Sequence, residues 1–524
     1  MAAQSWSTAG LSAACKEPLL TPDKGVEEVD LLVLGSFVLT MDAHDRVFED
    51  SGVAVRAGEI VAVGPRVELE GRYRPAETLC GGRRVLMPGL VDTYAHAGHG
   101  MIRGLFHPDH GWPAGELYWH ATSERWWYAE ALLAATERLR CGVTTGVSVV
   151  GATPARCDSP VFAEQGARAY AETGVRVVLG VGPPDPLFSH LEEPWSGSFL
   201  EGGHWVRRNF SYRDALQSSL ETVRNWHGAA GGLVGVALAP PYLFGRHVEH
   251  RRRPQRLPTA EDAPDILARA EELREHADRY GIQLHTHMFR GSVSFALKHF
   301  GAGVVSELLG PDVVIAHANG LLEPEVTTLG AAGCAVATVA YTHENLWYGL
   351  APIPELIGAG ATVTISSDGA APYTSLDLWR ELPRALWNQW LVRGNERILP
   401  PGVALRMVTV EAARALGLDD RLGSLEVGKR ADLIAVDLDR PHLVSGAFTP
   451  RLLVHYATGQ DVDTVIVDGR VLLRDGRPTR IDPVEIASLA REEARLALER
   501  LGVDEVGRYT QAFWNARVWE GADA

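Results

Sequence analysis

The chain has 524 residues, of which 46% are hydrophobic and 22% charged, and its formal net charge is −16. This length exceeds the size at which one hydrophobic core stops growing, so we expect one large domain and at least one smaller one. The acidic balance argues against a nucleic-acid or anionic-membrane partner, because either would need a basic face.

The sequence predicts a soluble, cytoplasmic protein without a membrane partner. No segment has the long apolar run of a membrane helix, and the first 25 residues lack a basic start followed by an apolar core. The five cysteines are scattered and show no Cys-x-x-Cys spacing, which fits a reducing compartment.

Both ends of the chain show strand patterns. After an expected flexible segment, residues 1–26, short alternating apolar runs fill residues 27–87, as in "DLLVLGSFVLTMD" and "GVAVRAGEIVAVG". They predict an antiparallel sheet with one wet face. The same alternating apolar pattern occurs again within residues 426–480, in "KRADLIAVDLD" and "DTVIVDGRVLLRDGR". We therefore expect one small sheet domain assembled from both ends.

The middle of the chain, residues 88–425, alternates apolar strands with helix-period segments, which is typical of repeated βα units. Eight such strands predict an α/β fold, a (β/α)₈ barrel. The expected strands are "LVDTYAH", "GVTTGVSVV", "VRVVLGVG", "LVGVALAP", "IQLHTHM", "VVIAHAN", "AVATVAYT" and "TVTISSDG". Residues 481–524 form a C-terminal segment, in which Pro483 to about Leu501 reads as an amphipathic helix.

Polar residues end most of the expected barrel strands, where barrel enzymes carry their chemistry. A single such histidine is more often a packed or surface residue than a ligand, but several at equivalent positions favour a site. The strand-end residues are Tyr94 and His96, His285 and His287, His317, Thr342 and His343, and Asp368.

The motifs "VLMPGLVDTYAHAGHGMIRGL", "LHTHM", "VVIAHANGL", "GLAPIPELIGAGATVTISSDGAA" and "GSLEVGKRADLIAVD" resemble those of the amidohydrolase superfamily. The resemblance is to the branch that holds chlorohydrolases and the guanine and S-adenosylhomocysteine deaminases. It implies a distorted TIM-like (β/α)₈ barrel with a β-sandwich built from both chain ends. Because barrels of this family often pair, it also implies a homodimer.

The resemblance further implies a mononuclear zinc or iron site. Its ligand positions are a His-x-His pair on strand one, here Tyr94 and His96, with His287 and Asp368. A divalent metal would lower the pKa of bound water to near 7. Asp368 would take the water's proton, and His317 would orient the group under attack. The expected fourth strand has no lysine, which argues against a binuclear site.

Two residues depart from the family's pattern. Tyr94 replaces a histidine, and Arg290 stands where the "HxxE" pattern of the deaminases places a proton-shuttling glutamate. An arginine is always charged and cannot exchange protons at neutral pH. His96, His287 and Asp368 could hold zinc with a water, or iron, with Tyr94 as a phenolate or a hydrogen-bond donor. Alternatively, Tyr94 fills the volume of a lost metal.

Further residues are candidates for contact with a small-molecule substrate. Arg290 predicts an anion or carbonyl clamp, with an ion pair to Glu344 as the alternative. His343 and Glu344 are a candidate acid/base pair, or else an exposed turn. Trp112 and His285 complete the expected substrate contacts, whereas His99 is interpreted as a loop residue.

Three functions follow. The first is metal-assisted hydrolysis of a C–N bond in a small heterocyclic or aromatic molecule. The second is a non-hydrolytic ring closure, elimination or rearrangement in specialised metabolism, with Tyr94, His343 and Arg290 as working groups. The third is a metal-free protein that only binds. The missing glutamate favours the second, because deamination needs a proton for the leaving amine; retention of His287, His317 and Asp368 favours the first.

Overall fold

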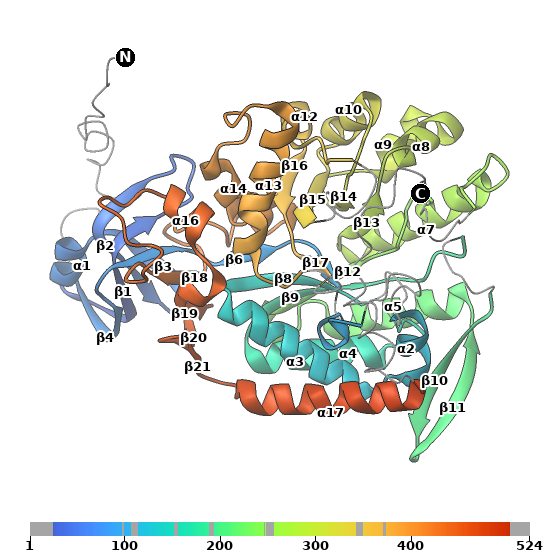
Figure 1. Ribbon diagram of the computed structural model, residues 1–524, viewed down its shortest axis with the longest axis horizontal. Helices are drawn as coiled ribbons and strands as arrows, with labels where there is room; N and C mark the ends of the chain where they lie inside the picture. The colour runs from blue at the N-terminus through green and yellow to red at the C-terminus, as the bar shows by residue number, and fades with distance from the viewer. Residues whose placement is uncertain are drawn as a thin grey trace, which may run out of the picture.

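The structure is a computed structural model that describes residues 25–96, 99–105, 114–150, 156–187, 193–245, 247, 256–341, 349–369 and 374–502. A barrel lies beside a smaller sheet along the long axis of the molecule (Figure 1). Among the described helices, none is long and apolar enough to cross a membrane.

The smaller sheet combines strands from both ends of the chain, in the order β21-β20-β19-β18-β5-β1-β2-β3, with β4 also paired to β1. The two halves meet at β5, which pairs with β1 and with β18. The strands are β1 (Glu27–Leu39), β2 (Val47–Arg56), β3 (Glu59–Pro65), β4 (Tyr73–Cys80), β5 (Arg84–Pro88), β18 (Leu433–Asp437), β19 (Val462–Val467), β20 (Arg470–Arg474) and β21 (Arg477–Pro478).

Two sequence predictions for this sheet are wrong. The sheet is mixed rather than antiparallel, since β4 and β5 both run parallel to β1. Helix α1 (Arg66–Arg72) lies between β3 and β4 in the chain and forms the crossover that a parallel pair requires. The expected wet face is also missing from β1: Leu31 and Val33 pack in one cluster, and Leu32 and Leu34 pack in another.

The second sheet is a closed ring of eight parallel strands, which confirms the predicted distorted barrel. Its eighth strand is broken into two parts: β16 pairs with β15, and β17 pairs with β7 of the first strand, so the ring closes. The strands are β6 (Leu90–Asp92) and β7 (Ala95–His96), β8 (Val143–Val149), β9 (Arg176–Val181), β12 (Val234–Leu238), β13 (Leu284–Met288), β14 (Val313–His317), β15 (Ala335–Thr338), and β16 (Thr362–Ile365) with β17 (Asp368–Gly369).

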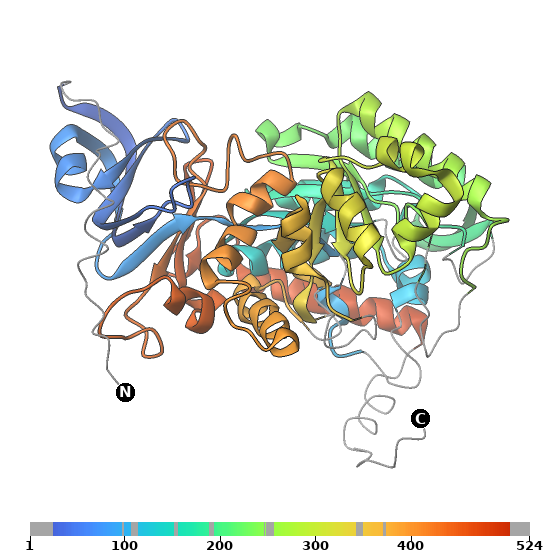
Figure 2. The ribbon, with the colours of Figure 1, turned by 90° about the horizontal axis from the view of Figure 1, so that it is seen from above.

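Helices cover the outside of the barrel (Figure 2). In α7 the buried side chains Ile266, Ala270, Leu273 and Ala277 form the stripe that the sequence predicted, and Gly281 ends the helix in a left-handed conformation. The helices around the barrel are α2 (Ala114–Ala121), α3 (Glu124–Arg140), α4 (Val161–Thr173), α5 (Tyr212–Trp226), α6 (Ala229–Gly232), α7 (Ala263–Tyr280), α8 (Ser292–Phe300), α9 (Ala302–Leu308), α10 (Glu323–Ala331), α12 (Ile353–Ala359), α13 (Leu378–Arg393), α14 (Pro401–Met407) and α15 (Val410–Ala415).

Four further elements extend this core: α16 (Arg451–Tyr456), the hairpin of β10 (Trp195–Glu201) and β11 (His204–Phe210), and α17 (Pro483–Leu501). Helix α17 confirms the predicted C-terminal helix and packs along α3 and α2 (Figure 1). The predicted domain boundaries stay predictions.

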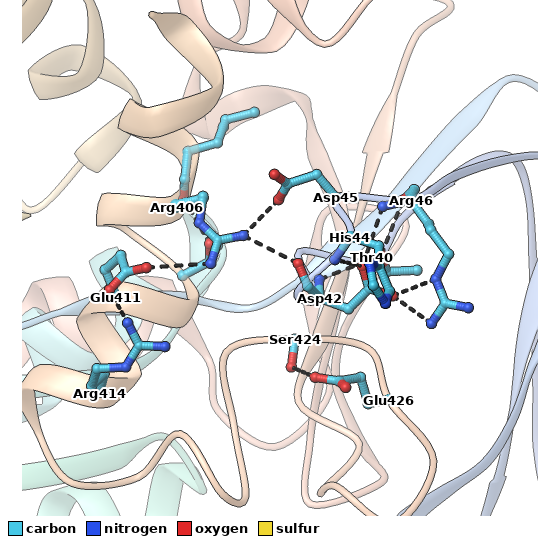
Figure 3. A network of polar contacts seen from close by, with 12 residues as sticks. Thr40, Asp42, His44, Asp45, Arg46, Arg406, Glu411, Arg414, Ser424 and Glu426 are labelled. Atoms are coloured by element: carbon cyan, nitrogen blue, oxygen red, sulfur yellow. Dashed lines mark hydrogen bonds and ion pairs between the residues drawn. The ribbon is translucent and has the colours of Figure 1, made fainter. Parts of the chain in front are cut away.

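A polar contact between two parts of the chain fixes the small sheet against the barrel (Figure 3). The Arg406 guanidinium of α14 donates to the Asp42 carbonyl at 3.1 Å and to the Asp45 carboxylate at 2.6 Å, both in the turn after β1. It also donates to Glu411 of α15 at 3.3 Å. The turn after β1 is therefore joined to helices that follow the last barrel strand.

Candidate active site

Five predicted residues meet at the carboxyl ends of four barrel strands. Tyr94 and His96 end the first strand, His287 lies near the end of β13, His317 ends β14, and Asp368 begins β17. Their rings are neighbours: the centroids of His96 and His287 are 5.7 Å apart, and those of His287 and His317 are 5.1 Å apart. The barrel thus brings together residues that are up to 274 positions apart in sequence.

Asp368 is held through both carboxylate oxygens. Its Oδ1 lies 3.2 Å from Nε2 of His96, and its Oδ2 accepts a hydrogen bond from the Tyr341 hydroxyl at 3.0 Å. Burial by itself would raise the pKa of this carboxyl, but the three surrounding histidines outweigh burial and hold the pKa below its ordinary value. Asp368 is therefore ionised at neutral pH.

His287 has a defined tautomer. Its Nδ1 lies 2.9 Å from the Pro241 carbonyl and must donate to it, so the lone pair is on Nε2. Burial, reinforced by the neighbouring histidines, lowers the pKa of His287 to about 3. The Tyr94 hydroxyl lies 3.3 Å from this Nε2. Burial and the charge of Asp368 raise the pKa of Tyr94, so its hydroxyl keeps its proton and donates it to His287.

The backbone at the ends of strands six and eight is strained. His317 has φ 72° and Asp368 has φ 57°, in the left-handed region that residues other than glycine rarely adopt. Such residues persist only where their surroundings determine them, and they cluster at functional sites. Burial lowers the pKa of His317, and its ring stacks on Phe289 at a centroid distance of 5.1 Å.

A buried polar network fixes the strand-eight residue next to Asp368. The Asp92 carboxylate accepts from the Ser367 hydroxyl at 2.7 Å and from the Ser367 backbone N–H at 3.1 Å. The Arg138 guanidinium of α3 donates to the same carboxylate at 3.1 Å. The backbone N–H of Asp368 donates to the Tyr94 carbonyl at 2.9 Å, so strands one and eight are tied together beside the site.

The donor types fit a divalent metal. His287 presents Nε2 while its Nδ1–H is held by a carbonyl, as is usual for metal-binding histidines. In the described part of the chain, however, no three His, Cys, Asp or Glu side chains converge closely enough to hold one ion.

The remaining predicted residues divide into two groups. His285 is fully buried, contacts Gln283 through Nε2 at 3.2 Å and stacks on Tyr94, so its substrate contact stays a prediction. The Arg290 side chain is exposed, and its backbone N–H donates to the Asn319 carbonyl at 3.1 Å; its role as a clamp also stays a prediction. Trp112, His343 and Glu344 lie outside the described residues.

One residue of the site, Tyr341, was missed by sequence reasoning. Tyr341 directly precedes Thr342, which the sequence places at the end of strand seven. This position could have identified Tyr341 as a candidate site residue. His99, interpreted as a loop residue, is buried, and its ring stacks on His96 at a centroid distance of 4.9 Å. Burial lowers the pKa of His99 well below its ordinary value.

Comparisons with known proteins agree with this fold. The amidohydrolase family matches residues 85–472. A 5-methylthioadenosine/S-adenosylhomocysteine deaminase of Desulforudis audaxviator is 30% identical, over 90% of this chain and 99% of its own. A 5'-deoxyadenosine deaminase of Methanosarcina acetivorans is 29% identical, over 90% and 98%.

Solved structures share the fold. An adenosine deaminase of Xanthomonas campestris with bound zinc has a TM-score of 0.73 and 24% identity, covering 91% of this chain and all of its own. Atrazine chlorohydrolase of Arthrobacter aurescens, complexed with zinc, has a TM-score of 0.70 and 24% identity, covering 88% of this chain and all of its own.

The closed ring of parallel strands, with polar residues at its carboxyl ends, and the family match define a barrel hydrolase. The chain belongs to the amidohydrolase family.

Proposed function

We propose that this protein is a metal-assisted deaminase that hydrolyses the exocyclic C–N bond of an amino-substituted heterocycle of the adenosine type. The observation that carries the proposal is the meeting of His96, His287, His317 and Asp368 at the carboxyl ends of strands one, five, six and eight. The names of the curated relatives described above, adenosine-type deaminases, support the substrate class.

In this proposal His96, His287 and Asp368 would hold one zinc or iron ion, for which these side chains would have to come closer together than they do in the structure. When bound, the ion supplies a hydroxide at neutral pH by lowering the pKa of a water. The hydrogen bond from His287 Nδ1 to the Pro241 carbonyl keeps the Nε2 lone pair directed into the site. The Tyr94 hydroxyl lies 3.3 Å from that nitrogen, and its hydrogen bond to Nε2 would be given up when the ion binds.

The proton steps fall to Asp368 and His317. Asp368 accepts a proton from the attacking water, and His317 faces the heterocycle and polarises its ring nitrogen or carbon. The position three residues after His287 is Arg290, which cannot exchange protons at neutral pH. Asp368 itself therefore carries this proton to the leaving amine, which departs as ammonia.

We further propose that the enzyme is a cytoplasmic homodimer that acts in specialised metabolism. The described thiols Cys141, Cys157 and Cys334 are free, which supports a reducing compartment.

Trp387 and Leu391 of α13 are exposed, 52% and 83%, which supports a second copy at that helix. Light scattering of the purified protein checks the mass of the assembly.

The test is turnover of 5-methylthioadenosine, S-adenosylhomocysteine, 5'-deoxyadenosine and adenosine, with ammonia release and the change in purine absorbance as readouts. In ¹⁸O-water we expect the label at the carbon that loses the amine. The matched control is Asp368→Asn, which keeps the size of the side chain and removes its charge. Product without ¹⁸O, or formed without ammonia, would contradict hydrolytic deamination.

A further inference from the structure

Tyr341 lies directly against the carboxylate at the centre of the site. It follows β15 at the end of strand seven, its side chain is 7% exposed, and its hydroxyl donates to Oδ2 of Asp368 at 3.0 Å. An ionised carboxylate only accepts hydrogen bonds, so the phenol is the donor. Burial and the neighbouring charge of Asp368 raise the pKa of Tyr341, which keeps that donor protonated.

Helix α13 holds the backbone of this residue. The Glu381 carboxylate accepts from the Tyr341 N–H at 3.3 Å, and the Asn388 amide donates to the Ala340 carbonyl at 3.1 Å. Glu381 is itself fixed, since it accepts from Thr374 at 3.1 Å and from Arg384 at 3.0 Å. A helix outside the ring therefore supports the backbone from which the phenol extends.

The opposite oxygen of the carboxylate faces His96 at 3.2 Å. Rotation of the Asp368 side chain would break both this contact and the one with Tyr341. The backbone of Asp368 has φ 57°, a conformation that needs support from its neighbours. The contacts with Tyr341, which follows β15, and with His96 of β7 hold the side chain from two different parts of the ring.

We propose that Tyr341 is a positioning residue of the site: its hydrogen bond to Oδ2 keeps Oδ1 of Asp368 turned toward His96. Through this contact, α13 sets the geometry of the carboxylate. The expected effect of Tyr341 on metal affinity rests on the proposed function, in which Asp368 is a metal ligand. The expected effect on the orientation of the carboxylate does not depend on that function.

Crystal structures of the full-length native chain and of Tyr341→Phe test the orientation. In the variant we expect the aromatic ring at position 341 to keep its place and the Asp368 carboxylate to turn, so that Oδ1 leaves hydrogen-bond range of His96, beyond about 3.5 Å. A carboxylate that keeps its native orientation in the variant overturns the inference, whether or not the protein binds a metal.

Zinc affinity, measured by competition with a chromophoric chelator, tests the consequence. Loss of a residue that orients a metal ligand typically weakens metal binding about 10- to 100-fold, and we expect a loss in that range for Tyr341→Phe. The matched control is Tyr73→Phe, a buried tyrosine of β4 that is 4% exposed, which should bind zinc as the native protein does. Unchanged affinity in Tyr341→Phe overturns the inference. No zinc binding by the native chain instead overturns the proposed function, and the crystal structures still decide the orientation.

Discussion

The hydroxyl of Tyr94 donates to Nε2 of His287 at 3.3 Å, so a residue at the end of the first barrel strand contacts the strand-five histidine directly. The hydrogen bond occupies the Nε2 lone pair that a metal would use, so a metal and Tyr94 compete for the same atom of His287. The alternative that Tyr94 fills the volume of a lost metal stays open.

The first prediction concerns metal content. We expect about one equivalent of zinc or iron in the native protein by inductively coupled plasma mass spectrometry. In Tyr94→His a third imidazole joins the set, and we expect zinc to bind roughly tenfold or more tightly, which is about 1.4 kcal/mol.

Tyr94→Phe is the control for that experiment, because it keeps the ring and removes only the donor to His287. A native protein without metal, together with metal gained by Tyr94→His, would mean that the tyrosine had replaced the metal chemistry of the site.

A second prediction concerns the proton acceptor. Asp368→Asn keeps the size of the side chain but can no longer accept a proton, so we expect turnover to fall by about 10²- to 10⁴-fold. Steady-state kinetics of ammonia release measure the loss. Asp45→Asn, on the exposed turn that contacts Arg406, should retain native rates. Native turnover in Asp368→Asn would remove this carboxylate from the mechanism.

A third prediction tests the buried ion pair beneath the site. The side chains of Asp92 and Arg138 are 0% and 1% exposed. Asp92→Ala leaves the guanidinium buried without its carboxylate, and we expect the free energy of unfolding to fall by about 3–5 kcal/mol in urea denaturation. The exposed pair of Arg495 and Glu499 provides the comparison: Glu499→Ala should cost less than about 1 kcal/mol. If Asp92→Ala and Glu499→Ala lower the free energy of unfolding equally, burial does not explain the stability that the Asp92–Arg138 pair provides.

A fourth prediction follows from Glu130 of α3, whose carboxylate accepts from the backbone N–H groups of Gly100 and Met101 at 2.8 and 2.9 Å. Burial raises the pKa of Glu130 from 4.5 to about 7, so between these values the folded protein binds more protons than the unfolded chain. The contribution of Glu130 to the free energy of unfolding is therefore fully present below pH 4.5. It is lost as the pH rises toward 7, and the free energy of unfolding falls by up to about 3 kcal/mol.

Urea denaturation at pH 5 and pH 8 of the native protein and of Glu130→Gln checks this loss. Glutamine does not titrate, so the variant should lack this part of the pH dependence. If both proteins lose the same stability between the two pH values, the carboxyl of Glu130 is not the cause.

Much of the barrel could be predicted because its signal is local. Each strand is a short apolar run that ends in a polar residue, and parallel strands align their carboxyl ends at one edge. This is why Tyr94, His96, His287, His317 and Asp368 could be grouped from the sequence. The mixed pairing of β1 with β4 and β5 could not be found in this way, because alternation along a strand does not report the direction of its neighbours.

The sequence by itself determined the order of the strands, the residue types at their ends and the two departures at Tyr94 and Arg290. Only the tertiary structure decided which atoms meet: Tyr94 with His287, Tyr341 with Asp368, and an exposed Arg290 side chain. The physical reason is that these contacts join different strands, and their geometry depends on closure of the ring and on helices such as α13 outside it. Spacing along one strand carries no information on either.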